Sequence, residues 1–138
     1  GGIALGNAGL GAVHGLAGPL GGLIEAPHGA LCGCLLPEVC RTNISLLEES
    51  HSSDDLLTRY DEIARILTGE EGAGRWDGVV WLEEIRTELD IPSLSRLGLA
   101  REMFDSIIDG ALRASSMKGN PIKLERRQLA AILDRAFR

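Results

Sequence analysis

Residues 11–29 constrain the fold more than any other part of the chain. They read GAVHGLAGPLGGLIEAPHG, an apolar, glycine-rich run that contains two histidines, His14 and His28. From residue 1 to residue 36 the only formally charged side chain is Glu25. A segment this apolar has to be covered by other elements. Its glycines need close neighbours, because each interior glycine costs a helix about 1 kcal/mol relative to alanine.

Apolar residues recur at helical spacing along most of the chain, and no segment alternates with period two for long enough to indicate a strand. We expect Pro19 to stop or bend the first helix, Pro37 to bend the second, and residues 43–53 to form a polar loop. The fold class is therefore predicted to be all-α, a bundle-like domain of six helices. The expected helices cover residues 3–20, 28–44, 54–68, 75–89, 99–115 and 125–137.

A chain of 138 residues is long enough for one domain with a modest core. Only 4% of its residues are aromatic, so Leu, Ile, Val and Ala have to build that core. A net charge of −6 argues against nucleic acid or an anionic membrane as a partner. Because the charge lies almost entirely after residue 45, we expect the first two helices to be central or covered by a partner domain.

The beginning of the chain indicates a piece of a longer protein. It opens on Gly-Gly without an initiator Met, and the apolar pattern is already running at residue 3. No basic region precedes the apolar stretch, as a signal peptide would require. We therefore expect a cytoplasmic protein with sequence missing upstream.

The three cysteines, Cys32, Cys34 and Cys40, lie close together in an apolar run. Their odd number, and the reducing environment of the cytosol in which we expect the protein, favour buried free thiols. A zinc site built from cysteines would need C-x2-C pairs or a second cluster, and the sequence has neither.

His14 and His28 are candidate ligands for a divalent metal. Neutral imidazole binds zinc and ferrous iron well, and a helix, a tight reversal and a second helix can bring residues fourteen apart together. Spacing alone leaves another interpretation open, in which one histidine bonds to backbone in the core and the other caps a helix after Pro27.

The residues around the two histidines resemble the metal-binding segment of the iron-containing (group III) alcohol dehydrogenases. The resemblance rests on four short stretches around the histidines, and residues 88–92, 97–98 and 120–121 are also similar to that family. It covers essentially the whole chain. The four stretches are Asn7-Ala8-Gly9-Leu10-Gly11, Pro19-Leu20-Gly21-Gly22, Pro27-His28-Gly29 and Leu35-Leu36-Pro37.

This resemblance implies that residues 1–138 are the C-terminal all-helical domain of the dehydroquinate synthase-like fold, with His14 and His28 as ligands of Fe2+ or Zn2+. It places an aspartate, a further histidine and an NAD(P)-binding domain upstream. It also implies a small alcohol or aldehyde substrate and hydride transfer with the metal as a Lewis acid. It leaves a homo-oligomer open and assigns no cofactor-binding residue here. The chain alone is expected to be inactive.

One position departs from the family pattern. Four residues after the first ligand, many members carry a histidine near the nicotinamide and the substrate, whereas this chain has Gly18. A glycine cannot relay a proton or bond to a ribose. A water or another side chain has to substitute, or the substrate range differs, and no catalytic residue of this chain is assigned.

Two other classes of function stay open. Small residues four apart, as in Gly11/Gly15 and Gly18/Gly22, also occur where membrane helices cross, although Pro19 and His14 lie inside this segment and no aromatic or basic anchors flank it. The chain could also be a non-catalytic helical interaction module, a degenerate member of the family. Metal content would distinguish that module from an enzyme domain.

Overall fold

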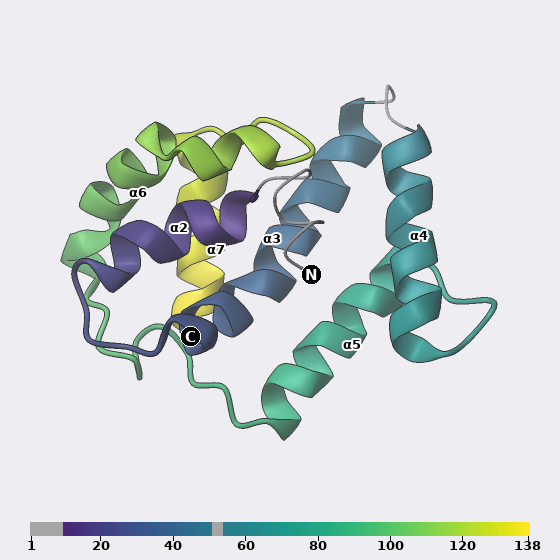
Figure 1. Ribbon diagram of the computed structural model, residues 1–138, viewed down its shortest axis with the longest axis horizontal. Coiled ribbons are helices and arrows are strands. Elements are labelled where there is room, and N and C mark those ends of the chain that lie inside the picture. The colour runs from purple at the N-terminus through teal and green to yellow at the C-terminus, as the bar shows by residue number, and fades with distance from the viewer. Residues whose placement is uncertain (1–9, 51–53) are drawn as a thin grey trace.

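The structure, a computed structural model, describes residues 10–50 and 54–138, and over these residues the fold is all-α (Figure 1). Six α-helices and two short 3-10 helices account for its regular structure, and the described ranges contain no strand. The predicted fold class is therefore confirmed. The elements are α2 (Ala12–Gly21), α3 (His28–Ser50), α4 (Asp54–Thr68), α5 (Arg75–Glu88), η1 (Arg101–Met103), α6 (Phe104–Arg113), η2 (Ser115–Gly119) and α7 (Arg126–Phe137).

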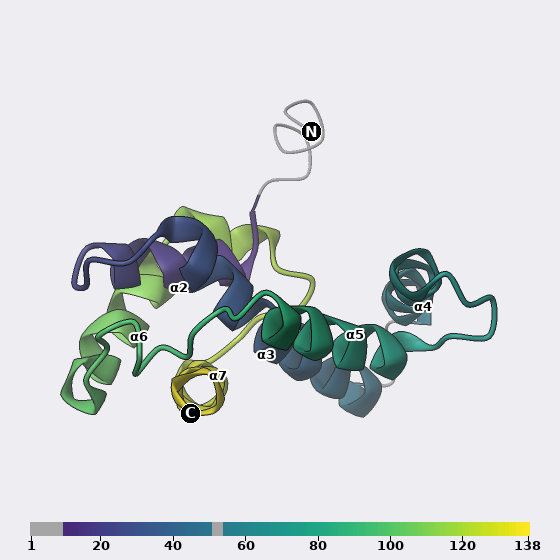
Figure 2. The same cartoon turned by 90° about the horizontal axis from the view of Figure 1, so that it is seen from below.

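Helix α3 is shared between two packed groups of helices (Figure 2). On one side it packs with α2, α6 and α7 around the larger core, in which Leu16, Leu35 and Leu133 are fully buried. On the other side α4 and α5 cover a smaller core that includes Ile44 and Leu47. Burial of the apolar faces of α2 and α3 confirms that the first two helices are central.

The glycine-rich helix α2 is supported by close packing, as its composition requires. A side chain at Gly15 would overlap Met117 of η2, and a Cβ added at Gly110 of α6 would lie 2.9 Å from the ring of Pro19. The Met117 side chain is flexible and can move aside, whereas the proline ring is rigid, so the approach of α2 to α6 is the one that depends on glycine. The helix ends at Gly21, two residues beyond Pro19. The part of the expected helix at residues 3–9 lies outside the described residues.

Asn120 fixes the beginning of α2 from the far end of the chain. Its Oδ1 accepts a hydrogen bond from the backbone N–H of Ala12 at 3.2 Å, which satisfies one of the free N–H groups of the helix terminus. Its side chain also exchanges two hydrogen bonds with that of Asn43 in α3, at 2.8 and 3.2 Å. The amide of Asn120 thus ties α2 to α3 at the start of the helix that carries His14.

The prediction of a polar loop over residues 43–53 is wrong for residues 43–50, because α3 continues through Pro37 to Ser50. Residues 51–53, with His51, lie outside the described residues. The continuation is stabilised by burial of Asn43, Ile44 and Leu47. Asn43 donates to Tyr60 of α4 at 3.2 Å, so its polar group is satisfied within the packed helix.

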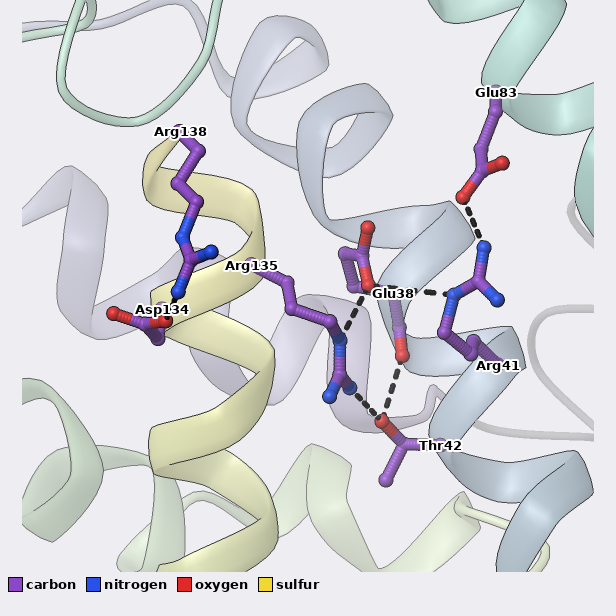
Figure 3. Close-up of polar contacts among 7 residues, drawn as sticks. All are labelled: Glu38, Arg41, Thr42, Glu83, Asp134, Arg135 and Arg138. Carbon is purple, nitrogen blue, oxygen red and sulfur yellow. Dashed lines mark hydrogen bonds and ion pairs between the residues drawn. The ribbon is translucent and has the colours of Figure 1, made fainter.

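A buried carboxylate, that of Glu38, joins α3 to α7 through the half-exposed Arg135 (Figure 3). The carboxylate of Glu38, only 7% exposed, accepts a hydrogen bond from Nε of Arg135 at 2.6 Å. The same guanidinium donates to Thr42 at 2.6 Å, and Arg41 approaches Glu38 at 3.7 Å and also bonds to Glu83 of α5. A buried carboxylate costs several kcal/mol unless it is paired in this way, so the pair specifies how α7 sits on α3.

Within residues 10–50 and 54–138, α3 is the one helix long and apolar enough to span a membrane by length and composition. More than half of its apolar window, 56%, is buried inside the domain. The other helices cover it on two sides, which is the setting of a core helix. The described part of the segment proposed as a membrane hairpin, α2, is likewise packed into the larger core.

The remaining boundaries follow the expectation closely. α4, α5 and α7 begin and end within one residue of the predicted ranges. The predicted helix over residues 99–115 is shorter, because the chain first makes the 3-10 turn η1 and α6 begins at Phe104.

Candidate metal centre

The two predicted ligands come together at the hairpin between α2 and α3. His14 lies in the first turn of α2, and His28 is the first residue of α3. The reversal over residues 22–27 turns the chain back so that the ring centroids are 5.4 Å apart, with 49° between the ring planes. The structure therefore places the two imidazoles next to each other. Small rotations of the two side chains would bring one nitrogen of each ring onto a shared ion.

Cys32 completes a group of three metal-binding side chains with the two histidines. One donor atom from each of His14, His28 and Cys32 lies within 4.8 Å of the other two, the only such group of His, Cys, Asp or Glu in the described residues. Cys32 Sγ is 3.4 Å from Nε2 of His28. No sequence motif points to Cys32, although a residue four positions after His28 on a helix lies on the same face, one turn further along.

The other two cysteines have different surroundings. Cys34 is fully buried in the larger core, and its thiol donates to the carbonyl of Ala136 at 3.3 Å. Cys40 packs against the smaller core. All three thiols are free, and the prediction of a buried structural thiol fits Cys34 best, whereas Cys32 is half-buried at the group with the histidines.

A cleft of about 460 Å³ opens beside this group between α2, α3 and the residues after η2. His14 and Cys32 lie at one part of its wall, and Asn43, Tyr60 and Asn120 provide polar groups elsewhere. Among the residues that the structure describes, the cleft is lined by no Lys, Arg, Asp or Glu. A neutral, largely apolar wall of this kind suits an uncharged ligand group.

Burial keeps the other ionisable groups of the cleft wall neutral. It raises the pKa of the Cys32 thiol and raises that of the Cys40 thiol to about 11. Burial also raises the pKa of Tyr60 to about 12, against the opposing effect of the hydrogen bond from Asn43. At neutral pH these three side chains add no charge to the cleft.

Gly18 lies on the exposed face of α2, one turn after His14. It stands where the resemblance described above places a histidine in many family members. A Cβ built there meets no heavy atom within 4 Å. The backbone therefore leaves room for a side chain that the sequence does not provide. Nothing in the described residues takes its place beside His14 as a third imidazole donor.

The donor set fits a divalent transition metal. Two imidazoles and a thiol are ligands that zinc and ferrous iron accept, and a soft sulfur donor is a poor match for Mg²⁺ or Ca²⁺. Three converging donors leave further coordination positions open.

Comparisons with known proteins show which family the chain belongs to. A model of the C-terminal part of the Fe-containing alcohol dehydrogenase family matches residues 1–137, and the chain therefore belongs to that family. It is 31% identical over 137 residues to the 1,3-propanediol dehydrogenase of Klebsiella pneumoniae, and 30% identical over 137 residues to alcohol dehydrogenase 4 of Saccharomyces cerevisiae. Each of these alignments covers 99% of this chain and 34% of the relative.

The solved structures show the same relationship. The alcohol dehydrogenase from Oenococcus oeni superposes with a TM-score of 0.82 at 32% identity, over 98% of this chain and 34% of that one. The chain thus spans about a third of the length of the proteins it matches. The match lies in the all-helical part of an oxidoreductase family, as the resemblance implied.

Proposed function

We propose that residues 1–138 are the helical, metal-binding domain of an NAD(P)-dependent alcohol dehydrogenase, and that His14 and His28 bind its divalent metal. The observation that carries the proposal is the convergence of two imidazoles from different helices, 5.4 Å apart, beside a neutral cleft. Family membership supports the class of reaction.

The role of the two histidines is to hold and orient the ion, Fe²⁺ or Zn²⁺. When bound, such an ion supplies Lewis-acid polarisation of the oxygen of an alcohol or carbonyl compound. Hydride transfer belongs to the NAD(P) cofactor, which this chain positions only together with a dinucleotide-binding domain. The first turn of α2, held by Asn120, and the first turn of α3 set the directions of the two rings.

The uncharged cleft wall favours small uncharged alcohols and aldehydes as substrates. Its volume of about 460 Å³ lies within the range of small-molecule sites. The relatives include a 1,3-propanediol dehydrogenase and a lactaldehyde reductase, and these names support short, polar alcohols and aldehydes. Because Gly18 has no side chain, water or another side chain has to take the proton of the substrate, or the substrate range differs from that of relatives with a histidine there.

The remaining parts of the proposal come from the family and the sequence. The further ligands, an aspartate and a histidine, and the NAD(P) site belong to an upstream domain, which is the partner of this one. A cytoplasmic location and the absence of nucleic-acid or membrane partners stay predictions.

His14→Ala tests the proposal in the protein that joins this chain to its dinucleotide-binding domain. We expect at least a hundredfold loss of alcohol oxidation and loss of the metal from the purified protein, because one of few ligands is removed. Metal content is measured by mass spectrometry and turnover by the absorbance of NAD(P)H. Full turnover with full metal content in this variant would refute the ligand assignment.

Residues 1–138 alone should show no turnover with NAD or NADP, because they lack the upstream ligands and the cofactor domain that the family resemblance implies. Retention of metal by this chain separates the enzyme domain from a non-catalytic interaction module. If neither this chain alone nor the protein that joins it to its dinucleotide-binding domain binds a metal, the non-catalytic interaction module would be supported.

A further inference from the structure

We infer that Cys32 is a third protein ligand of the metal, so that this chain supplies a mixed set of two imidazoles and one thiolate. The inference rests on the proposed metal site and concerns a residue that no motif of the sequence analysis assigned to it. It follows from the position of Cys32 on α3, from its distance to His28 and from the different settings of the other cysteines.

Helix geometry places Cys32 where a second ligand on α3 has to be. Residues i and i+4 lie one above the other on the same face, which is why helical metal sites use this spacing for paired ligands. His28 begins α3 and Cys32 follows four residues later. The two side chains therefore point to one spot in front of the helix, and α2 brings His14 to the same spot.

The two donors on α3 are joined by a hydrogen bond, and their distance is also that of two ligands sharing an ion. A zinc ion about 2.1 Å from a nitrogen and about 2.3 Å from a sulfur, at a tetrahedral angle, keeps these atoms roughly 3.6 Å apart. Cys32 Sγ and His28 Nε2 are 3.4 Å apart. The donor of His14 lies within 4.8 Å of both, against roughly 3.4 Å for two nitrogens on one zinc. Rotation of a half-buried imidazole about its two side-chain torsions covers this difference.

Cys32 differs from the other cysteines in what its sulfur can reach. The sulfur of Cys34 is fully buried and bonded to the backbone of α7, and Cys40 lies among the residues of the smaller core. Cys40 also lines the cleft, but of the three cysteines it is Cys32 whose sulfur contacts an imidazole, that of His28. The Cys32 sulfur has a solvent-accessible cleft on one side and two imidazoles on the other. A metal ligand needs these surroundings, whereas a residue that only packs in the core does not.

A thiolate ligand changes which metal the site prefers. Sulfur is a soft donor that favours zinc over ferrous iron in a mixed nitrogen and sulfur set, and it disfavours Mg²⁺ and Mn²⁺. The structure therefore points to zinc as the metal that this chain holds best, with Co²⁺ as its spectroscopic substitute.

Titration of the chain with Co²⁺ tests the inference without any measurement of turnover. A cobalt–thiolate bond gives a charge-transfer band in the near ultraviolet that cobalt bound by imidazole alone lacks. We expect this band in the unaltered chain, its loss in Cys32→Ser, and at least tenfold weaker Zn²⁺ binding by that variant in a competition assay. Circular dichroism checks that the variant keeps its helices.

Cys40→Ser is the matched control, because Cys40 lies two turns further along the same face of α3 and also lines the cleft. It should keep the band and the zinc affinity. Cobalt binding that depends on His14 and His28, with no thiolate band and no effect of Cys32→Ser, would overturn the role of Cys32 and leave the metal site intact. Failure to bind cobalt or zinc both by the unaltered chain and by the protein that joins it to its dinucleotide-binding domain would overturn the metal site itself, and this inference with it.

Discussion

Individual glycines in this chain have different structural roles. The contacts that an added Cβ atom would make at each position distinguish these roles. Gly110 of α6 faces the ring of Pro19, and an added Cβ would lie 2.9 Å from two of its carbons. Gly18 of α2 is exposed and has free space where its Cβ would be. The first glycine permits two helices to approach, whereas the second only weakens its helix.

Gly110→Ala should destabilise the domain by about 1–2 kcal/mol, because the rigid proline ring has to move, and overpacking outweighs the gain in helix propensity of about 1 kcal/mol. Gly18→Ala is the control, with an expected stabilisation of about 0.5–1 kcal/mol. Urea unfolding followed by circular dichroism measures both. A stabilised Gly110→Ala variant would show that α2 and α6 do not approach as closely as described.

At the scale of an element, α2 depends on an amide that lies 108 residues away. Asn120 receives the N–H of Ala12, exchanges two hydrogen bonds with Asn43 and donates to the carbonyl of Ile122 at 2.8 Å. Loss of this amide leaves several half-buried polar groups without a partner, and each such group costs about 1–3 kcal/mol.

Asn120→Ala is therefore expected to lower the free energy of unfolding by about 2–3 kcal/mol. The matched control is Gln128→Ala, which removes a side-chain amide with a single bond to the exposed N–H of Glu125. It should cost about 0.5–1 kcal/mol. Equal effects of the two substitutions in chemical unfolding would contradict the role of Asn120 as the anchor of α2.

The pairing of α4 with α5 carries a pH dependence. Arg75 binds the carboxylate of Asp61 through two side-chain hydrogen bonds, at 2.7 and 2.9 Å, and one from its backbone N–H. The hydrogen bond of the Arg75 guanidinium, partly opposed by burial, holds the pKa of Asp61 below its ordinary value of 3.8. A carboxyl group whose pKa is lowered on folding stabilises the folded state at any pH above its ordinary pKa. This stabilisation disappears as the pH falls through the pKa of the folded state.

Asp61→Asn should therefore be less stable than the unaltered chain by about 1 kcal/mol at pH 7, and the two should converge as the pH falls below 4. Unfolding at a series of pH values measures the difference. Asp105→Asn is the control, because it removes a largely exposed carboxylate beside Arg126 and should change the free energy of unfolding at pH 7 by less than about 0.5 kcal/mol. A constant difference between pH 7 and pH 3 would contradict the assignment to this ion pair.

For the whole molecule, the sequence predicts the helices but not how they meet. Apolar spacing locates six helices, because each buries one face and Gly or Pro separates most of them. The end of α3 escapes this reasoning, because Asn43 is polar and is buried only through its bonds to Tyr60 and Asn120, which lie far along the chain. The apolar residues after it, Ile44 and Leu47, are covered by α4 and α5. The ion pair of Glu38 and Arg135 likewise joins residues 97 apart.

The candidate site shows the same division. A family motif around His14 and His28 is visible in the sequence, and the resemblance assigns these two residues. Cys32 is one helical turn from His28 on the predicted helix over residues 28–44, so their shared face follows from the sequence. The approach of His14 on α2 to the same spot does not. The sequence shows that Gly18 departs from the motif. Only the structure shows that the space around this residue is open.

Helix α3 explains why the site is stable at the edge of the domain. It carries His28 at its first residue, crosses both cores and is tied to α7 by Glu38 and Arg135. A ligand at the end of so well packed a helix is positioned by the whole domain, which favours a preformed metal site.

An anomalous difference map from crystals of this chain loaded with zinc tests the central claim most directly. We expect a single strong peak between α2 and α3, about 2.1 Å from a ring nitrogen of both His14 and His28. A zinc ion bound elsewhere, or one that contacts only one of the two rings, would contradict the assignment of His14 and His28 as a metal-binding pair.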